Sequence, residues 1–142
     1  MSSRLSSELI APWEEINAYQ QQMGREAKYG ACSVFVGSMR DFNEGQDVQR
    51  MLLEHYPGMT DKFLEQLCLE ATERWELLDT LLIHRVGEIR PNDTIVVIAV
   101  WSAHRKQAFE ACRYLIEELK HRAPLWKKES LTGGDRWVEK NT

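Results

Sequence analysis

The sequence has few cysteines and no long hydrophobic run. Its three cysteines are an odd number without a C-x-x-C spacing. We expect buried, reduced thiols at Cys32, Cys68 and Cys112, with a redox or metal role as the less favoured alternative. The longest strongly apolar run, Ile95 to Trp101, is far too short to cross a bilayer, and the first residues, MSSRLSSELIAP, lack the apolar centre of a secretion signal. These absences predict a cytoplasmic protein that does not associate with a membrane.

The common short catalytic motifs are also missing. There is no P-loop, no G-x-G-x-x-G, no H-E-x-x-H and no G-x-S-x-G, so the nucleotide-binding, zinc-protease and serine-hydrolase classes have no motif behind them. The four histidines, His55, His84, His104 and His121, have no metal-ligand spacing among themselves or with the cysteines. We therefore expect neither a metal nor a cofactor.

Positive charge is scarce overall but concentrated near the C-terminus. The chain has 18 Lys+Arg against 22 Asp+Glu, a formal net charge of −4, which argues against general affinity for nucleic acid. Residues 1–100 carry 9 basic and 16 acidic side chains, whereas residues 101–142 carry 9 basic and 6 acidic ones. A basic C-terminal third on an acidic protein favours a small anionic ligand over a polymer.

Hydrophobic periodicity predicts three helices and six strands. The helices are Pro12 to about Met23, Asp61 to about Trp75 with Thr60 as N-cap, and a long one from the N-cap Ser102 to near Arg122. The strands are Tyr29–Met39, Val48–Tyr56, Thr80–Val86, Thr94–Trp101, Leu125–Leu131 and Arg136–Val138.

Turn signals lie between the strands of each successive pair. They are residues 41–47, Arg90-Pro91-Asn92-Asp93 and Gly133-Gly134, and each predicted hairpin follows a predicted helix. At 142 residues the chain fits one globular domain, spanning residues 1–142. The predicted fold class is α+β, a single domain with a mainly antiparallel sheet and three helices.

The long helix carries basic residues at both ends. His104 and Arg105 lie in its predicted first turn, where exposed amides and the positive end of the helix dipole already favour a phosphate or carboxylate. Lys120 lies near its other end. Basic groups placed in this way predict an anion site.

Several motifs carry a resemblance to a known family. They are GSMRDFNEG from Gly37, LEHYPGM from Leu53, IHRVGEI from Ile83, SAHR from Ser102, LKHRAPLWKKE from Leu119 and GDRWV from Gly134. In order and spacing they resemble the catalytic (large) subunit of molybdopterin synthase, from about Gly30 to Val138. Residues 1–29 match the family poorly.

The resemblance implies an α/β-hammerhead-like fold and a sulfurtransferase of molybdenum cofactor biosynthesis. Such enzymes convert cyclic pyranopterin monophosphate to molybdopterin, using sulfur from the C-terminal Gly-Gly thiocarboxylate of a small ubiquitin-like carrier subunit. The assembly implied is a central homodimer with one carrier at each end, a heterotetramer. By motif position the catalytic residues are Lys120 and Lys127. Substrate contacts are implied for Ser38, Met39, Arg40, His104, Arg105, Lys120, Lys127, Lys128 and Glu129.

Each of these residues also has a simpler interpretation. Lys120 could be a solvated cation at a helix end, and His104 a capping or surface histidine. Lys127 and Lys128 are adjacent, so on a strand they point to opposite faces, and motif position favours Lys127 as the one that faces the substrate. We interpret His55, His84 and Arg85 as structural or interface residues, and Trp126 and Trp137 as core or interface packing.

Two other function classes remain open from the residues. The chain could be a non-catalytic dimeric binding module for a phosphorylated small molecule, or, less favoured, a hydrolase of a cyclic phosphate. Helix geometry adds one constraint on any shared site. His104 and Lys120 are about 24 Å apart along one helix at ~1.5 Å per residue, so a single site could contain both only if His104 and Arg105 came from a second subunit.

Overall fold

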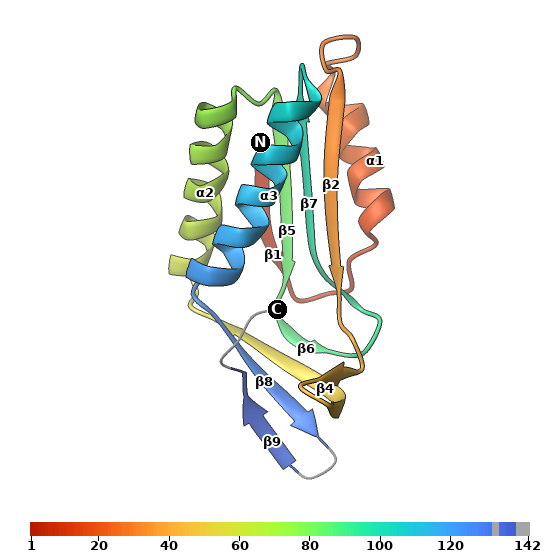
Figure 1. The fold of residues 1–142 in the computed structure, drawn as a ribbon, viewed down its shortest axis with the longest axis vertical. Coiled ribbons are helices and arrows are strands. Elements are labelled where there is room, and N and C mark those ends of the chain that lie inside the picture. The colour runs from red at the N-terminus through yellow and green to blue at the C-terminus, as the bar shows by residue number, and fades with distance from the viewer. Residues whose placement is uncertain (132–133, 139–142) are drawn as a thin grey trace.

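The computed structural model describes residues 1–131 and 134–138 of the chain, which form three helices and nine strands (Figure 1). The helices are α1 (Pro12–Met23), α2 (Met59–Trp75) and α3 (Arg105–Arg122). The strands are β1 (Ser2–Ser6), β2 (Ala31–Ser38), β3 (Phe42–Asn43), β4 (Gln46–His55), β5 (Asp79–Arg85), β6 (Gly87–Ile89), β7 (Thr94–Ser102), β8 (Leu125–Leu131) and β9 (Gly134–Trp137).

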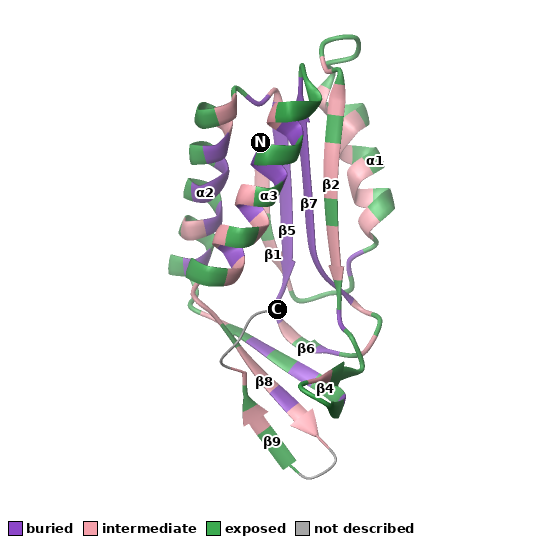
Figure 2. Cartoon of the chain, viewed as in Figure 1, coloured by how far each residue is buried: buried purple, intermediate pink, exposed green. Residues whose placement is uncertain are grey.

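The larger sheet has the strand order β1-β5-β7-β2 and is covered by helices on both faces. Strands β5 and β7 are buried along their whole length, which explains their nearly continuous apolar sequences (Figure 2). Successive side chains of β5 point to opposite faces of this sheet. Leu81 and Ile83 pack toward α1, whereas Leu82 joins the core cluster formed with α2 and α3.

The smaller sheet has five strands, but it contains fewer residues than the four-stranded larger sheet. Its order is β3-β4-β8-β9, and β6 pairs with β4. It lies beyond the C-terminal end of α3, which leads directly into β8 (Figure 1). Strand β4 contributes Val48, Met51 and Leu53 to the main core, so the two sheets share one hydrophobic interior. Arg40, Lys120 and Lys127 lie together at the boundary between these sheets.

The predicted fold class is confirmed: the domain is α+β, with three helices and mostly antiparallel pairing. The predicted hairpins 80–101 and 125–138 form, although β6 stands between the two strands of the first. Of the predicted Gly133-Gly134 turn, only Gly134 belongs to the described residues, and Gly133 lies outside them.

The predicted hairpin between Tyr29–Met39 and Val48–Tyr56 is wrong. Strand β2 pairs with β7, and β4 pairs with β3, β6 and β8. Apolar alternation identified both strands but carried no information about their partners. Strand β1, a short polar strand that pairs in parallel with β5, was not predicted from the sequence.

Both predicted helix caps are displaced. The N-cap of α2 is Gly58, whose amide donates to Asp61 Oδ2 at 3.0 Å, while Thr60 Oγ1 donates to the Pro124 carbonyl at 2.9 Å. The N-cap of α3 is His104, and the hydroxyl of Ser102 donates to the His104 carbonyl. In both places a threonine or serine near the helix start bonds to a carbonyl instead of an orphan amide.

Burial corrects two further expectations. Cys68 and Cys112 are buried free thiols as predicted, but Cys32 is exposed. Trp126 and Trp137 are about half exposed, at 48% and 53%, so the core alternative predicted for them is wrong, whereas interface packing stays a prediction. No helix within residues 1–131 and 134–138 combines the length and apolar character needed to span a membrane.

Candidate functional site at the junction of the two sheets

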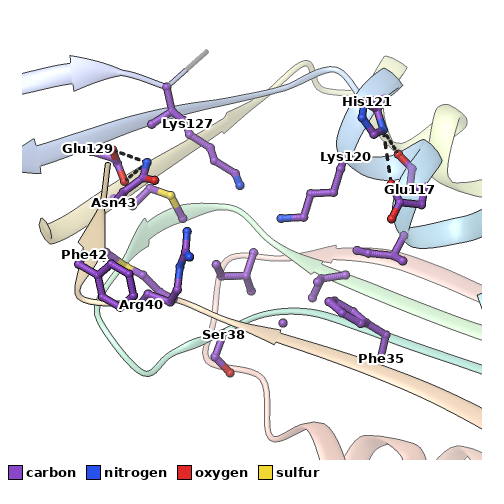
Figure 3. Close-up of a pocket in the computed structure, with 17 residues that line it drawn as sticks. Phe35, Ser38, Arg40, Phe42, Asn43, Glu117, Lys120, His121, Lys127 and Glu129 are labelled. Carbon is purple, nitrogen blue, oxygen red and sulfur yellow. Dashed lines mark hydrogen bonds and ion pairs between the residues drawn. The ribbon is translucent and has the colours of Figure 1, made fainter. Parts of the chain in front are cut away.

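A pocket of about 610 Å³ lies where the end of α3 meets the smaller sheet (Figure 3). It is open to solvent on one side and contains three of the six basic residues predicted for the site, Arg40, Lys120 and Lys127. Its lining residues are Phe35, Gly37, Ser38, Met39, Arg40, Phe42, Asn43, Met51, Ile95, Val96, Ile116, Glu117, Lys120, His121, Lys127, Glu129 and Val138.

Lys120 and Lys127 reach this pocket from different elements. Lys120 lies one helical turn after Ile116, on the face of α3 that turns toward the pocket. Lys127 lies on β8 opposite the buried Leu53 of β4. In Figure 3 the two ammonium ends point toward one another across the pocket.

Burial of this lysine pair changes its protonation. Desolvation lowers the pKa of both amines, and the positive charge of Arg40 lowers both further. The two amines also interact with each other, and the positive charge of Lys120 lowers the pKa of Lys127. The pKa of Lys127 falls to about 7, so the pair can supply a neutral amine as well as a charged one near physiological pH.

Glu129, which occupies the next pocket-facing position of β8 after Lys127, partly offsets the lowering of the Lys127 pKa. Its carboxylate is 6% exposed and attracts the proton of Lys127, which raises the pKa of that lysine. The carboxylate accepts hydrogen bonds from Asn43 Nδ2 at 3.1 and 3.2 Å and from Arg136 Nε at 3.1 Å. Arg136 also donates to the Asn43 carbonyl at 2.9 Å. These bonds hold the β3–β4 hairpin against β8 and β9 along one wall of the pocket.

The segment after β2 supplies the third basic group. A bulge between Gly37 and Ser38 shifts the register of β2 against β7, and the pairing ends with Ser38 opposite Thr94. Met39 then exchanges backbone hydrogen bonds with Asn92 and Asp93 at 2.8 and 2.9 Å. Arg40 follows, and its guanidinium lies over the Phe42 ring at 5.1 Å. The backbone therefore fixes the point from which Arg40 extends into the pocket.

A histidine lies beneath the lysine pair. His84 is 2% exposed, and its Nδ1 lies 2.7 Å from the Arg85 carbonyl. Burial, together with the charges on Lys120 and Lys127, lowers the pKa of His84 to about 4. Its ring is therefore neutral at physiological pH and adds no charge under the lysines.

The pocket combines six of the nine predicted site residues. They are Ser38, Met39, Arg40, Lys120, Lys127 and Glu129. Lys128 faces the opposite side of β8, as strand alternation predicted, and its Nζ lies 3.9 Å from Asp135 Oδ2. His104 and Arg105 lie at the other end of α3, beside Gly30 in a separate hollow of about 510 Å³.

Sequence reasoning did not select several residues of the pocket. Asn43 and Arg136 lie in motifs that it quoted, but only their contact with Glu129 identifies them as parts of the site. Glu117 and His121 also line the pocket, and helical spacing could have found them, because Glu117 lies three residues before Lys120 and His121 lies four residues after Glu117.

Gly37 belongs to the pocket lining at a point that has no room for a side chain. A methyl group at this position would lie 2.9 Å from Val96 Cγ1 and 3.1 Å from Phe35 Cε1. Taken together, the arrangement is a partly apolar cavity with three converging basic groups, which can bind a small anion and move a proton beside it.

Comparisons with known proteins identify the family of the chain. The model of the family described as MoaE protein matches residues 11–122. The molybdopterin synthase catalytic subunit of Pseudomonas aeruginosa is 45% identical over 139 residues, which cover 98% of this chain and 91% of that protein.

Two solved structures share the fold. The crystal structure of molybdopterin synthase from Staphylococcus aureus has a TM-score of 0.83 and 34% identity, and the match covers 94% of each chain. A chain from the complex of subunits 1 and 2 of molybdopterin-converting factor from Helicobacter pylori has a TM-score of 0.80 and covers 99% of this chain and 92% of its own. At 21% identity, that second likeness shows the fold alone.

Proposed function

The chain belongs to the MoaE protein family and functions as a molybdopterin synthase catalytic subunit, and we propose that the pocket between its two sheets is the site of sulfur transfer. The observation that carries this proposal is the buried pair Lys120 and Lys127, which meets Arg40 in a cavity open to solvent. Burying adjacent amines costs stability, so their placement needs a functional explanation.

The proposed substrate is cyclic pyranopterin monophosphate. Its phosphate needs cations, and Arg40 offers a planar fork of donors while a lysine offers a mobile point charge. The apolar part of the lining, which includes Met51, Ile95 and Val96, suits the ring system of a pterin. A cavity of about 610 Å³ is within the range that small-molecule sites occupy.

The two lysines have complementary roles in the proposed chemistry. Attack by a thiocarboxylate sulfur builds negative charge on an oxygen of the substrate, and the charged Lys120 amine stabilises or protonates that oxygen. The neutral Lys127 amine then accepts a proton from the water molecule that cleaves the bond between the carrier's carbonyl carbon and the sulfur, which releases the carrier as a carboxylate and leaves the sulfur on the substrate. Since the sulfur arrives on another protein, the chain needs no catalytic cysteine, which is consistent with its two buried thiols and the absence of any cysteine from the pocket lining.

The proposed sulfur donor is a small ubiquitin-like carrier with a C-terminal Gly-Gly thiocarboxylate. The complex of two subunits named for the Helicobacter pylori relative supports a second protein in the reaction. A glycine tail is narrow enough to reach a pocket partly walled by the Asn43 and Glu129 contact, and it could present its terminal sulfur near Lys127.

We also propose a homodimer in which the second copy completes each site. His104 and Arg105 begin α3, whereas Lys120 lies near its end, so one chain cannot bring both groups to one small ligand. A second copy that placed its own His104 and Arg105 near the pocket would add two cationic donors for the phosphate.

The test is reconstitution from purified components. The chain is mixed with a thiocarboxylated carrier and cyclic pyranopterin monophosphate, and molybdopterin is measured. A carrier ending in an ordinary carboxylate is the control and should give no product. Binding of the substrate without product from the thiocarboxylated carrier would contradict the proposal and favour a binding module for phosphorylated small molecules.

A further inference from the structure

Arg85 is a buried arginine at the point where the chain passes between the two sheets. It is the last residue of β5 in the larger sheet and is only 4% exposed. Two residues later, Gly87 adopts a φ of +89° and begins β6, which pairs with β4 of the smaller sheet. The Arg85 guanidinium therefore lies at the junction of the sheets.

Its contacts join the segments on both sides of this junction. Nη2 donates to the Glu88 carbonyl of β6 at 2.7 Å, and Nη1 lies 3.9 Å from Asp93 Oδ2 in the turn before β7. Within the described residues, Nε and Nη1 have no hydrogen-bond partner. A neutral side chain would avoid the desolvation cost of this guanidinium, so stability alone does not explain an arginine here.

Both contacted segments lead to the basic groups of the pocket. The backbone of Asp93 accepts a hydrogen bond from Met39, the residue before Arg40. In the other direction, Glu88 of β6 is paired with Leu52 of β4. The next residue of β4, Leu53, is paired with Lys127 of β8. Arg85 therefore contacts Asp93, which binds the residue before Arg40, and Glu88, which pairs with the strand that carries the partner of Lys127.

We propose that Arg85 is a positioning residue that fixes the smaller sheet against the larger one and thereby sets the separation of Lys120 from Lys127. Lys120 is carried by α3, which packs on the larger sheet, whereas Lys127 is carried by β8 of the smaller sheet. Any shift between the sheets therefore changes the distance between the two amines. The consequence for turnover rests on the proposed function, but the positional effect does not.

The experiment compares Arg85→Met and Arg85→Lys with Arg90→Met. Arg90 is the matched control, because it lies in the same turn region and its side chain is 69% exposed and bonds only to the Glu88 side chain, at 2.9 Å, among the contacts described. The side-chain amines of Lys120 and Lys127 are titrated by NMR in the substrate-free chain. Thermal unfolding of each variant shows whether it is folded.

Arg85→Met should let the amines separate and gain water, so their titration should move up by ~1 pH unit toward that of ordinary lysine. Arg85→Lys keeps the charge but cannot reach both partners, and should give a smaller shift. Arg90→Met should leave the titration unchanged. In the sulfur-transfer assay, kcat of Arg85→Met should fall ~10- to 100-fold, with a smaller change in KM, because a small misplacement of reacting groups is costly.

A folded Arg85→Met chain with the wild-type lysine titration overturns the proposal. If neither Arg85 variant folds, Asp93→Asn replaces them, because it weakens the contact between Arg85 and Asp93 from a partly exposed position. An unchanged lysine titration in Asp93→Asn would then also overturn the proposal. If the titration moves but even the wild-type chain transfers no sulfur, the proposed function fails while the positioning role stands.

Discussion

At the scale of single residues, the structure separates two adjacent lysines. Lys127 faces the pocket and Lys128 faces away from it, so their replacements should differ sharply. Lys120→Ala should abolish sulfur transfer, Lys127→Ala should reduce it ~100-fold or more, and Lys128→Ala should have a mild effect. Product formation under saturating carrier checks this order. Greater damage from Lys128→Ala than from Lys127→Ala would show that the assigned site is on the wrong face of β8.

The buried amine of Lys127 should also destabilise the fold in a pH-dependent way. Its pKa is lowered in the folded chain, so the unfolded chain binds more protons in the window between that lowered pKa and the ordinary lysine pKa of ~10.4. Stability from this group therefore rises with pH through the window, and the penalty is complete below it. Lys127→Met should raise Tm, and the gain should be larger at pH 6 than at pH 9.

Lys128→Met is the control for this measurement. It removes an equivalent charge from the solvent-facing side of the same strand, so its change in Tm should be nearly the same at both pH values. A gain from Lys127→Met that did not depend on pH would mean that the amine is ordinarily protonated throughout the range.

At the scale of elements, one buried carboxylate adds side-chain contacts between β3, β8 and β9 to the pairing of β4 with β8. Glu129 binds Asn43 and Arg136, so Glu129→Gln should lose charge-assisted hydrogen bonds worth ~1.5–3 kcal/mol to the free energy of unfolding. It should also lower the pKa of Lys127 further, since the carboxylate now raises it. Urea unfolding measures the first effect.

Glu44→Gln provides the matched comparison. The Glu44 carboxylate lies 3.7 Å from Arg136 Nη1 and is 59% exposed, so its loss should change stability by less than ~0.5 kcal/mol. Equal losses from the two variants would show that the buried contact does not hold the hairpins together.

The same scale shows what the sequence could predict. Continuous apolar runs identified β5 and β7, and three- and four-residue spacing placed α1 with the bounds it has in the structure. Strand pairing was beyond this reasoning, because alternation in β2 and β4 fits any partner that offers an apolar face. Strand β1 was missed because its polar residues, SSRLS, have no alternation and gain their order from the edge of β5.

Sequence reasoning could predict a site residue where the residue lay in a recognised motif or where strand alternation gave the direction of its side chain. Lys120 and Lys127 stood out within motifs, and alternation on a strand was enough to separate Lys127 from Lys128. Asn43 and Arg136 required knowledge that two hairpins distant in sequence meet at Glu129. Arg85 gave no sign of being buried at a junction, since that depends on β6, a three-residue strand with little pattern.

At the scale of the whole molecule, the length of α3 divides the predicted site residues into two groups. Arg105–Arg122 spans 18 residues, with His104 and Arg105 at one end and Lys120 near the other. If the proposed dimer completes each pocket with the partner's first turn of α3, then residues from the two ends should complement each other between chains. Residues from the same end should not.

This predicts rescue in a mixed dimer. His104→Ala and Lys120→Ala chains should each be inactive as homodimers, whereas their heterodimer has one site with both lesions and one intact site. About half of the wild-type activity per dimer should therefore return. Lys120→Ala mixed with Lys127→Ala is the control, because both changes affect the same end and every mixed site keeps one lesion. Failure of the first pair to regain activity, with subunit exchange confirmed by differently tagged chains, would leave His104 and Arg105 outside the catalytic pocket as the N-terminal anion site of their own helix.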